Sequence, residues 1–145
     1  MPFAEVAVQA PTGPARTFSY SIPPHFALLP GHLVWVPFGS QTLLGVVFAL
    51  APEPAVPVTR PVLALLHPTP LLSPEDLRTA RWISEEYLCS LYEAAALFLP
   101  PRMTLRPNVR FRLTHEATPP GDLSAEERAA WVRASRPQGV SLLEV

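Results

Sequence analysis

The sequence predicts a mainly β domain of small, barrel-like architecture with helices on its C-terminal side, followed by the start of a second domain. Three observations predict this organisation. The first seventy or so residues contain several short segments with the alternation or β-branched composition of strands, separated by turns. Helix start signals begin at Ser73, and the character of the sequence changes again after residue 102. A chain of 145 residues is long enough for one compact domain and part of another.

The clearest strand lies at residues 16–22, where apolar and small polar side chains alternate strictly. This alternation puts Phe18 and Tyr20 on one face and Thr17 and Ser19 on the other, as in a half-buried strand. The other candidate strands are short, apolar or β-branched, and separated by turns: the segment around Val6 and Val8, and residues 32–38, 43–50 and 62–66. We therefore expect antiparallel strands across about residues 3–66, forming a small barrel or sandwich.

Helices are expected across about residues 74–99. Ser73 has the features of an N-cap, because a proline and then two acids follow it. Ser90 and Glu93 have the spacing of a capping box, which predicts that a second short helix restarts there. A Leu-Pro-Pro sequence then ends the helical part, so we place the first domain at residues 1–102.

Residues 103–145 are interpreted as the truncated start of a second domain. A strand is expected at about 108–114, and a capping box at Ser124 opens a helix toward Arg133. Prolines, 20 of 145 residues, cluster in the connections, above all in residues 52–61.

Composition excludes several classes of function. Lysine is absent, so neither a Walker A phosphate loop nor a Schiff-base lysine is possible on this chain. Cys89 is the only cysteine, which excludes an internal disulfide and a thiolate metal cluster. The four histidines lack metal-ligand spacing, and no serine lies in a G-x-S-x-G sequence. We therefore expect no catalytic residue, no metal site and no cofactor.

The charge and hydropathy patterns set the expected surroundings of the chain. The longest apolar run, residues 43–51, is too short to cross a bilayer, and no signal peptide is recognisable, so we expect a cytoplasmic protein without membrane contact. The net charge is −1, yet residues 101–145 hold seven arginines against five acids. Four of these arginines lie close together and form either a solvated face or a set of phosphate contacts: Arg102, Arg106, Arg110 and Arg112.

Two interpretations are open for the aromatic residues of the predicted strands. They are either core side chains or a platform on which a nucleic-acid base stacks: Phe18, Tyr20, Trp35 and Phe38. The segment Val36-Pro37-Phe38-Gly39 is more specific, because proline cannot donate to a strand ladder and glycine permits close backbone approach. It indicates either a strand end whose backbone is open to a ligand or a plain turn.

Short motifs follow one another along the first hundred residues: Val6-Ala7-Val8, Thr17-Phe18-Ser19-Tyr20, Pro30-Gly31, Val34-x-Val36-Pro37-Phe38-Gly39, Gly45-Val46-Val47, then Trp82-Ile83, Tyr87 and Leu99-Pro100. Each motif is weak alone, but the co-linear combination resembles the amino terminus of primosomal protein N′, the PriA-type replication-restart helicases. The resemblance covers roughly residues 1–102. It implies a 3′ DNA-binding domain with a small, loosely OB-like barrel followed by helices, and residues 103–145 are similar to the start of a winged-helix domain.

In that family a shallow pocket receives the terminal nucleotide of a nascent strand at a stalled fork. Carried over by motif, the resemblance implies a pocket with four main residues: Phe18, Ser19, Gly39 and Arg60. Two further residues would support it, Tyr20 and Pro37. Phe18 would pack on the terminal base or sugar. Gly39 would allow the nucleotide to approach, and Arg60, where the family tends to have lysine, would hold a phosphate or base edge.

Ser19 departs from the family pattern, which often has an aspartate at this position. A serine hydroxyl can accept a hydrogen bond from a 3′-hydroxyl, but a neutral acceptor is weaker than a carboxylate. In addition, Phe18 and Ser19 face opposite ways on a regular strand. Both can reach one nucleotide only if the strand ends or bulges there.

The expected function is therefore a non-enzymatic DNA-binding module that recognises the 3′ end of a nascent strand at stalled or branched forks. Its partners would be DNA and, by resemblance, other primosome or single-strand-binding proteins. The family's helicase lobes would lie beyond this chain. The alternative is a protein-interaction β-barrel without direct DNA binding, which the net charge of −1 supports. A complete small enzyme is a third class, opposed by the lack of a catalytic constellation.

Overall fold

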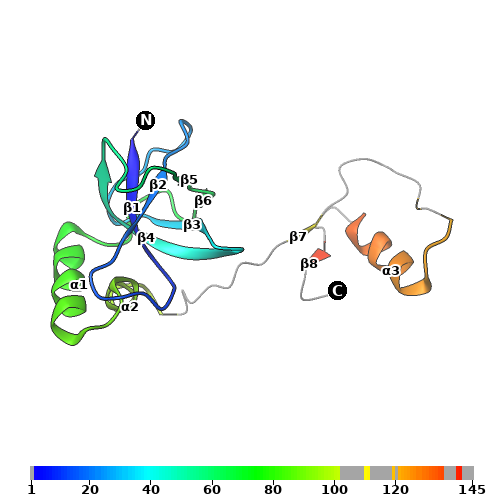
Figure 1. The fold of residues 1–145 in the computed structure, drawn as a ribbon. Helices are drawn as coiled ribbons and strands as arrows, with labels where there is room; N and C mark the ends of the chain where they lie inside the picture. The colour runs from blue at the N-terminus through cyan, green and yellow to red at the C-terminus, as the bar shows by residue number, and fades with distance from the viewer. Residues whose placement is uncertain (1, 102–109, 112–118, 120, 136–139, 142–145) are drawn as a thin grey trace. The chain divides into compact units, whose positions relative to one another are not determined.

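The computed structural model describes residues 2–101, 110–111, 119, 121–135 and 140–141 (Figure 1). The chain divides into two compact units, Met1–Leu105 and Arg106–Val145. Within the described ranges, no helix is both long enough and apolar enough to cross a membrane.

The first unit is built on a six-stranded sheet (Figure 1). Its strands are β1 (Phe3–Val8), β2 (Phe18–Ser21), β3 (Leu33–Phe38), β4 (Gln41–Ala51), β5 (Arg60–Pro61) and β6 (Ala64–Leu65). They lie in the order β5-β2-β1-β4-β3-β6, and every pair is antiparallel except β2 with β5. The predicted small barrel-like fold is confirmed, but the parallel pair makes the sheet mixed rather than wholly antiparallel.

The sheet curls because its two edge strands follow one another in the chain. Only Val62 and Leu63 separate β5 at one edge from β6 at the other. The Val62 N–H donates to Ser21 O at 3.0 Å and the Leu63 N–H donates to Trp35 O at 2.9 Å, so the link is bonded to β2 and to β3. A register shift in the β1–β4 pairing adds a local bend. As a result the side of the sheet with β5 and β2 turns toward the side with β3 and β6.

Both faces of the curled sheet are buried, which explains why its central strands are apolar almost throughout. The enclosed face carries a cluster rich in valines: Ala4, Val6, Val8, Tyr20, Ile22, Leu28, Val34, Val36, Val47 and Val62. The opposite face contributes Ala7, Leu33, Leu44, Val46 and Phe48 to a second cluster, which it shares with the helical segment.

The helical segment contains α1 (Pro74–Tyr87) and α2 (Leu91–Ala96), which lie side by side in Figure 1. Each begins with a capping box, formed by Ser73 with Asp76 and by Ser90 with Glu93. The two helices fall within the range expected from the sequence. They cover the sheet face that the curl leaves open.

The turn before β3 requires a glycine. Gly31 has a φ of +93°, and a Cβ added to it would lie 2.1 Å from Leu72 O. The Leu71 N–H donates to Gly31 O at 3.0 Å, so this turn is joined to the start of the helical segment. The neighbouring His32 is buried, where its Nδ1 accepts from the Leu29 N–H at 2.8 Å. This histidine therefore has a structural role.

The described part of the second unit is small. The strands β7 (Arg110–Phe111) and β8 (Val140–Ser141) pair antiparallel. The helix α3 (Ala125–Ala134) begins at its N-cap Ser124, as expected from the capping box. Most of the strand expected at 108–114 lies outside the described residues, and the winged-helix assignment stays a prediction.

Candidate nucleic-acid interface

A hollow of about 300 Å³ opens where β2 faces the end of β3; we call it the β2–β3 pocket. Its lining includes all six residues that the resemblance assigns to an end-binding pocket: Phe18, Ser19, Tyr20, Pro37, Gly39 and Arg60. The remaining lining residues come from the segment before β2, the end of β3 and the proline-rich segment: Arg16, Thr17, Phe38, Ala55, Val56 and Val58. The fold thus gathers residues that lie up to about forty positions apart in the sequence.

Three contacts join the two sides of this pocket, although β2 and β3 are not neighbours in the sheet. The buried Tyr20 hydroxyl donates to Pro37 O at 2.8 Å. The rings of Phe18 and Phe38 meet edge to face, with centroids 5.1 Å apart. On β5, the Arg60 Nη1 donates to Gly39 O at 2.8 Å. These contacts close the curl of the sheet, so the pocket has a fixed framework.

Tyr20 has a role in this framework. Burial raises the pKa of the Tyr20 hydroxyl above its ordinary value, and the neighbouring Arg60 guanidinium lowers it by a smaller amount. The hydroxyl therefore stays protonated at neutral pH and can keep its bond to Pro37 O. Tyr20 belongs to the enclosed core cluster, so its ring supports the pocket from beneath.

Phe18 forms the centre of an apolar wall. Its ring is half-buried, and the Arg16 guanidinium lies over it, 5.1 Å from the centroid. Val56 and Val58 belong to the same wall and are 45% and 81% exposed, which is high for apolar side chains. Exposed apolar groups beside a phenyl ring form a surface against which a sugar or base can pack.

Ser19 lies on the other side of β2 and is only 8% exposed. Its hydroxyl donates to the Glu5 carboxylate, and it accepts a hydrogen bond from the Ala55 N–H at 3.1 Å. The second bond holds the proline-rich segment against β2 as a wall of the pocket. Because β2 begins at Phe18, the chain leaves its regular strand at this point, and Phe18 and Ser19 both line the pocket.

Gly39 and Arg60 form the opposite rim. Gly39 has a φ of +59°, and a Cβ added there would meet no atom within 4 Å. Space is therefore open beside its backbone. Arg60 is exposed, and a guanidinium has five N–H donors, so the bond to Gly39 O leaves it able to bind a phosphate.

The described lining residues include two arginines, Arg16 and Arg60, and no acid. The lining residue Ser19 is hydrogen-bonded to the carboxylate of Glu5, which lies behind it. A positive rim around an apolar wall is the arrangement found where proteins bind single-stranded nucleic acid.

Comparison with known proteins assigns this architecture to a family. A family model described as the 3′ DNA-binding domain (3′BD) of PriA matches residues 5–100. The chain belongs to this family. The match includes most of β1, the other five strands of the first unit's sheet and both of its helices, so the first unit is a DNA-binding domain.

Two proteins, each named Replication restart protein PriA, are similar to the chain. The one from Synechocystis sp. is 29% identical over 126 residues, which cover 81% of this chain and 14% of that protein. The one from Bacillus subtilis is 31% identical over 125 residues, which cover 83% of this chain and 16% of that protein. The chain thus spans about one-seventh of the length of these relatives.

Several lining residues of this 3′ DNA-binding domain were not assigned to the pocket from the sequence. Arg16 and Phe38 adjoin predicted site residues, but only the fold shows that they contact Phe18. Val56 and Val58 lie in a segment that we interpreted as a mere connection. The role of Glu5 depends on the β1–β2 register, in which it lies opposite Ser19. The available signal for the contact between Glu5 and Ser19 was that both are polar residues on predicted strands.

Among the described residues of the first unit, Trp35 is a candidate that does not line the pocket. Trp35, considered as part of a stacking platform, packs against the cluster beneath the helices instead. Arg102, Arg106 and Arg112 lie outside the described residues, and Arg110 lies in β7, where only the backbone path is described. Their contact with phosphate stays a prediction.

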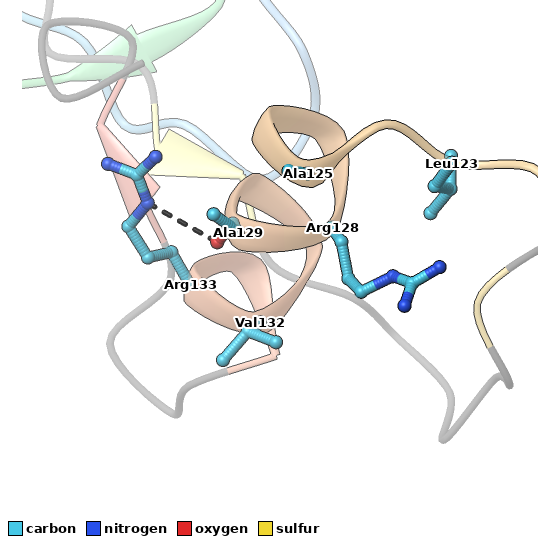
Figure 2. A pocket seen from close by; sticks show the side chains of 6 residues that line it. All are labelled: Leu123, Ala125, Arg128, Ala129, Val132 and Arg133. Atoms are coloured by element: carbon cyan, nitrogen blue, oxygen red, sulfur yellow. Dashed lines mark hydrogen bonds between the residues drawn. The ribbon is translucent and has the colours of Figure 1, made fainter.

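A larger hollow, of about 770 Å³, lies along α3 (Figure 2). Its lining comes from this one helix and Leu123 just before it, and no residue of α3 is buried. The Arg133 side chain turns back along the helix, where its Nε donates to Ala129 O at 3.3 Å (Figure 2). This hollow is the open side of a single helix, and we do not treat it as a site.

Proposed function

We propose that the β2–β3 pocket receives the terminal nucleotide of a DNA strand that ends in a free 3′-hydroxyl. One observation carries this proposal: six residues from separate segments converge on one hollow that offers phenyl rings, guanidinium groups and a hydroxyl acceptor together. A hollow of about 300 Å³ is at the lower end of the range for small-ligand pockets, which suits one nucleotide rather than several.

Each part of the pocket has a chemical role in this proposal. Phe18, with the valines of the proline-rich segment, packs on the terminal sugar or base. Arg16 and Arg60 hold the phosphate that links the terminal nucleotide to the strand. The remaining acceptor site of the Ser19 oxygen takes the hydrogen of the 3′-hydroxyl. The backbone at Gly39 leaves room for the nucleotide to enter.

The names of the relatives, both replication restart proteins, support the process that we propose. We infer that the domain locates the 3′ end of a nascent strand at a stalled or branched fork. Other primosome or single-strand-binding proteins are the partners expected in that process. On this proposal the chain itself hydrolyses no ATP, since it has no lysine with which to hold the β- and γ-phosphates of ATP in a Walker A loop.

The direct test compares two DNA strands of identical sequence, one with a free 3′-hydroxyl and one with a 3′-phosphate, by fluorescence anisotropy at low salt. The free end should bind more tightly. A neutral hydrogen bond contributes roughly 0.5–1.5 kcal/mol, which corresponds to about a twofold to twelvefold difference in affinity. Equal affinity for a free end and for ends blocked with a phosphate or lacking the hydroxyl would contradict end recognition.

A protein-interaction surface is the second candidate function. The end of α1 exposes three large side chains outside the pocket: Trp82 at 56%, Tyr87 at 70% and Leu88 at 76%. The rings of Trp82 and Tyr87 contact each other edge to face, 6.2 Å apart. Adjacent exposed aromatic side chains are typical of protein interfaces. Failure to bind any DNA strand at low salt would favour this function over the first.

A further inference from the structure

Two hydroxyl groups of β2 and the turn before it converge on one carboxylate. The Thr17 Oγ1 donates to Glu5 Oε2 at 3.0 Å, and the Ser19 Oγ donates to Glu5 Oε1. Glu5 lies on β1 directly opposite Ser19, is half-buried, and does not line the β2–β3 pocket. Any influence that Glu5 has on a bound strand therefore acts through Ser19 or through its charge.

The hydrogen-bonding capacity of Ser19 is almost fully used. A hydroxyl has one hydrogen to donate and two lone pairs with which to accept. The hydrogen goes to Glu5, and one lone pair accepts the Ala55 N–H at 3.1 Å. One acceptor position is left, and no donor. Toward a ligand in the pocket, Ser19 is thus an acceptor only.

We propose that Glu5 is a positioning residue that determines the specificity of the pocket. Because of Glu5, the pocket selects strand ends that donate a hydrogen bond over strand ends that only accept one. This proposal rests on the proposed function. A 3′-hydroxyl can donate to the free lone pair of Ser19. A 3′-phosphate at neutral pH offers mainly acceptor oxygens and carries about 1.5 to 2 negative charges. It therefore meets both an acceptor and a carboxylate.

Because the rim carries two arginines, a preference for a hydroxyl end over a phosphate end needs an opposing negative charge. Arg16 and Arg60 both line the pocket, and guanidinium groups bind phosphates readily. A pocket with these two groups alone would hold a terminal phosphate at least as well as a hydroxyl. The Glu5 carboxylate opposes this attraction from the side of Ser19, where the end of the strand is expected.

The test uses three strands of identical sequence that end in a 3′-hydroxyl, a 3′-phosphate or a 2′,3′-dideoxy sugar. Wild type should prefer the hydroxyl over the phosphate by more than about twofold and up to about twelvefold, the range expected of one hydrogen bond. Glu5→Gln removes the charge, and its carboxamide can donate as well as accept, so the Ser19 hydrogen becomes free for the ligand. In this variant the hydroxyl-over-phosphate ratio should fall to about twofold or less. The hydroxyl-over-dideoxy preference should persist.

One matched variant separates this effect from net charge. Glu53→Gln removes one exposed carboxylate from the adjacent proline-rich segment and should keep the wild-type ratio. If Glu5→Gln does not fold, Glu5→Thr removes the same charge with a residue that strands favour.

The outcomes distinguish this proposal from the one on which it rests. If wild type binds the hydroxyl and dideoxy strands equally, the proposed function is wrong and this inference fails with it. If wild type prefers the hydroxyl but Glu5→Gln and Glu5→Thr keep the hydroxyl-over-phosphate ratio, only the inference on Glu5 is overturned. An equal fall of the ratio in Glu53→Gln would also overturn it, because the cause would then be net charge.

Discussion

Gly39 combines a left-handed backbone with open space beside it, which makes it the most direct probe of the pocket. Its φ is +59°, and a Cβ added there would meet no atom within 4 Å. Asparagine tolerates the left-handed region, so Gly39→Asn should fold normally while its side chain occupies the approach to the pocket. We expect at least a tenfold loss of affinity for strands with a free 3′ end, roughly the effect of 1.4 kcal/mol, with an unchanged melting temperature.

The bulkier Gly39→Val is a poorer probe, because a β-branched residue at this φ adds backbone strain of roughly 1–2 kcal/mol. It should weaken both end binding and thermal stability. Wild-type end binding by Gly39→Asn would show that the strand does not approach along Gly39.

At position 19, adding a carboxylate should lower the stability of the fold unless Glu5 is neutralised. Ser19 and Glu5 are directly opposite each other on β2 and β1, and like charges in such a pair destabilise a sheet by up to about 1 kcal/mol. Ser19→Asp alone should therefore lower the urea midpoint. The double variant Glu5→Gln with Ser19→Asp should recover it and should prefer a 3′-hydroxyl end more strongly than Glu5→Gln alone, since a charged acceptor binds a hydroxyl more tightly.

At the scale of elements, local signals in the sequence were sufficient to predict the helices and most of the strands. The capping boxes at Ser73 and Ser90 predicted the helix starts because a cap involves only residues three positions apart. The alternation around Phe18 predicted β2 for the same reason. Residues 62–66, expected as one strand, instead divide between the link and β6, because the chain there crosses from one sheet edge to the other.

The pocket could be predicted only in part. The resemblance supplied Phe18, Ser19, Gly39 and Arg60 without supplying their contacts. The bond of Ser19 to Ala55 and the ring contact of Phe38 depend on how the sheet curls, which no periodicity encodes. The carboxylate of Glu5 was missed because strand register is a long-range property.

Ser84 joins α1 to the turn before β2 and to the link between α1 and α2, and its loss should affect stability rather than binding. It is fully buried on α1, accepts the Ala15 N–H at 2.8 Å and donates to Cys89 O at 2.7 Å. Ser84→Ala leaves the part-buried Ala15 N–H and Cys89 carbonyl unpaired, and an unpaired group costs roughly 1–3 kcal/mol when fully buried and less where water reaches it. Urea unfolding should show a loss of about 2 kcal/mol.

A matched control for this prediction lies on the same helix. Thr79 is exposed, and its hydroxyl donates to Glu75 O at 2.9 Å within the helix. Thr79→Ala should change stability by less than about 0.5 kcal/mol, as is usual at exposed positions. Both variants should keep the wild-type preference for a free 3′ end, and a lost preference in Ser84→Ala would mean that the helices help to shape the pocket.

At the scale of the whole molecule, the net charge of −1 and the distribution of arginines determine how DNA binding depends on salt. Among the described residues of the first unit, the arginines that line the β2–β3 pocket are Arg16 and Arg60. Each phosphate neutralised on a single strand contributes about 0.7 to the slope of log affinity against log salt, so two contacts give a slope of about −1.4. This is a weak dependence for a DNA-binding protein, and recognition should rest largely on packing and hydrogen bonds.

Arg60→Gln should therefore reduce the magnitude of this slope by about 0.7, because it removes one of the two phosphate contacts. Arg78→Gln is the matched control, since Arg78 is exposed on α1 and forms an ion pair with Glu75 at 3.1 Å outside the pocket. It removes the same charge and should leave the slope unchanged. Affinity measured by anisotropy between low and moderate salt gives both slopes. A wild-type slope steeper than about −3 would require more than about four phosphate contacts, and the arginines at 102, 106, 110 and 112 would then be the main DNA-binding surface.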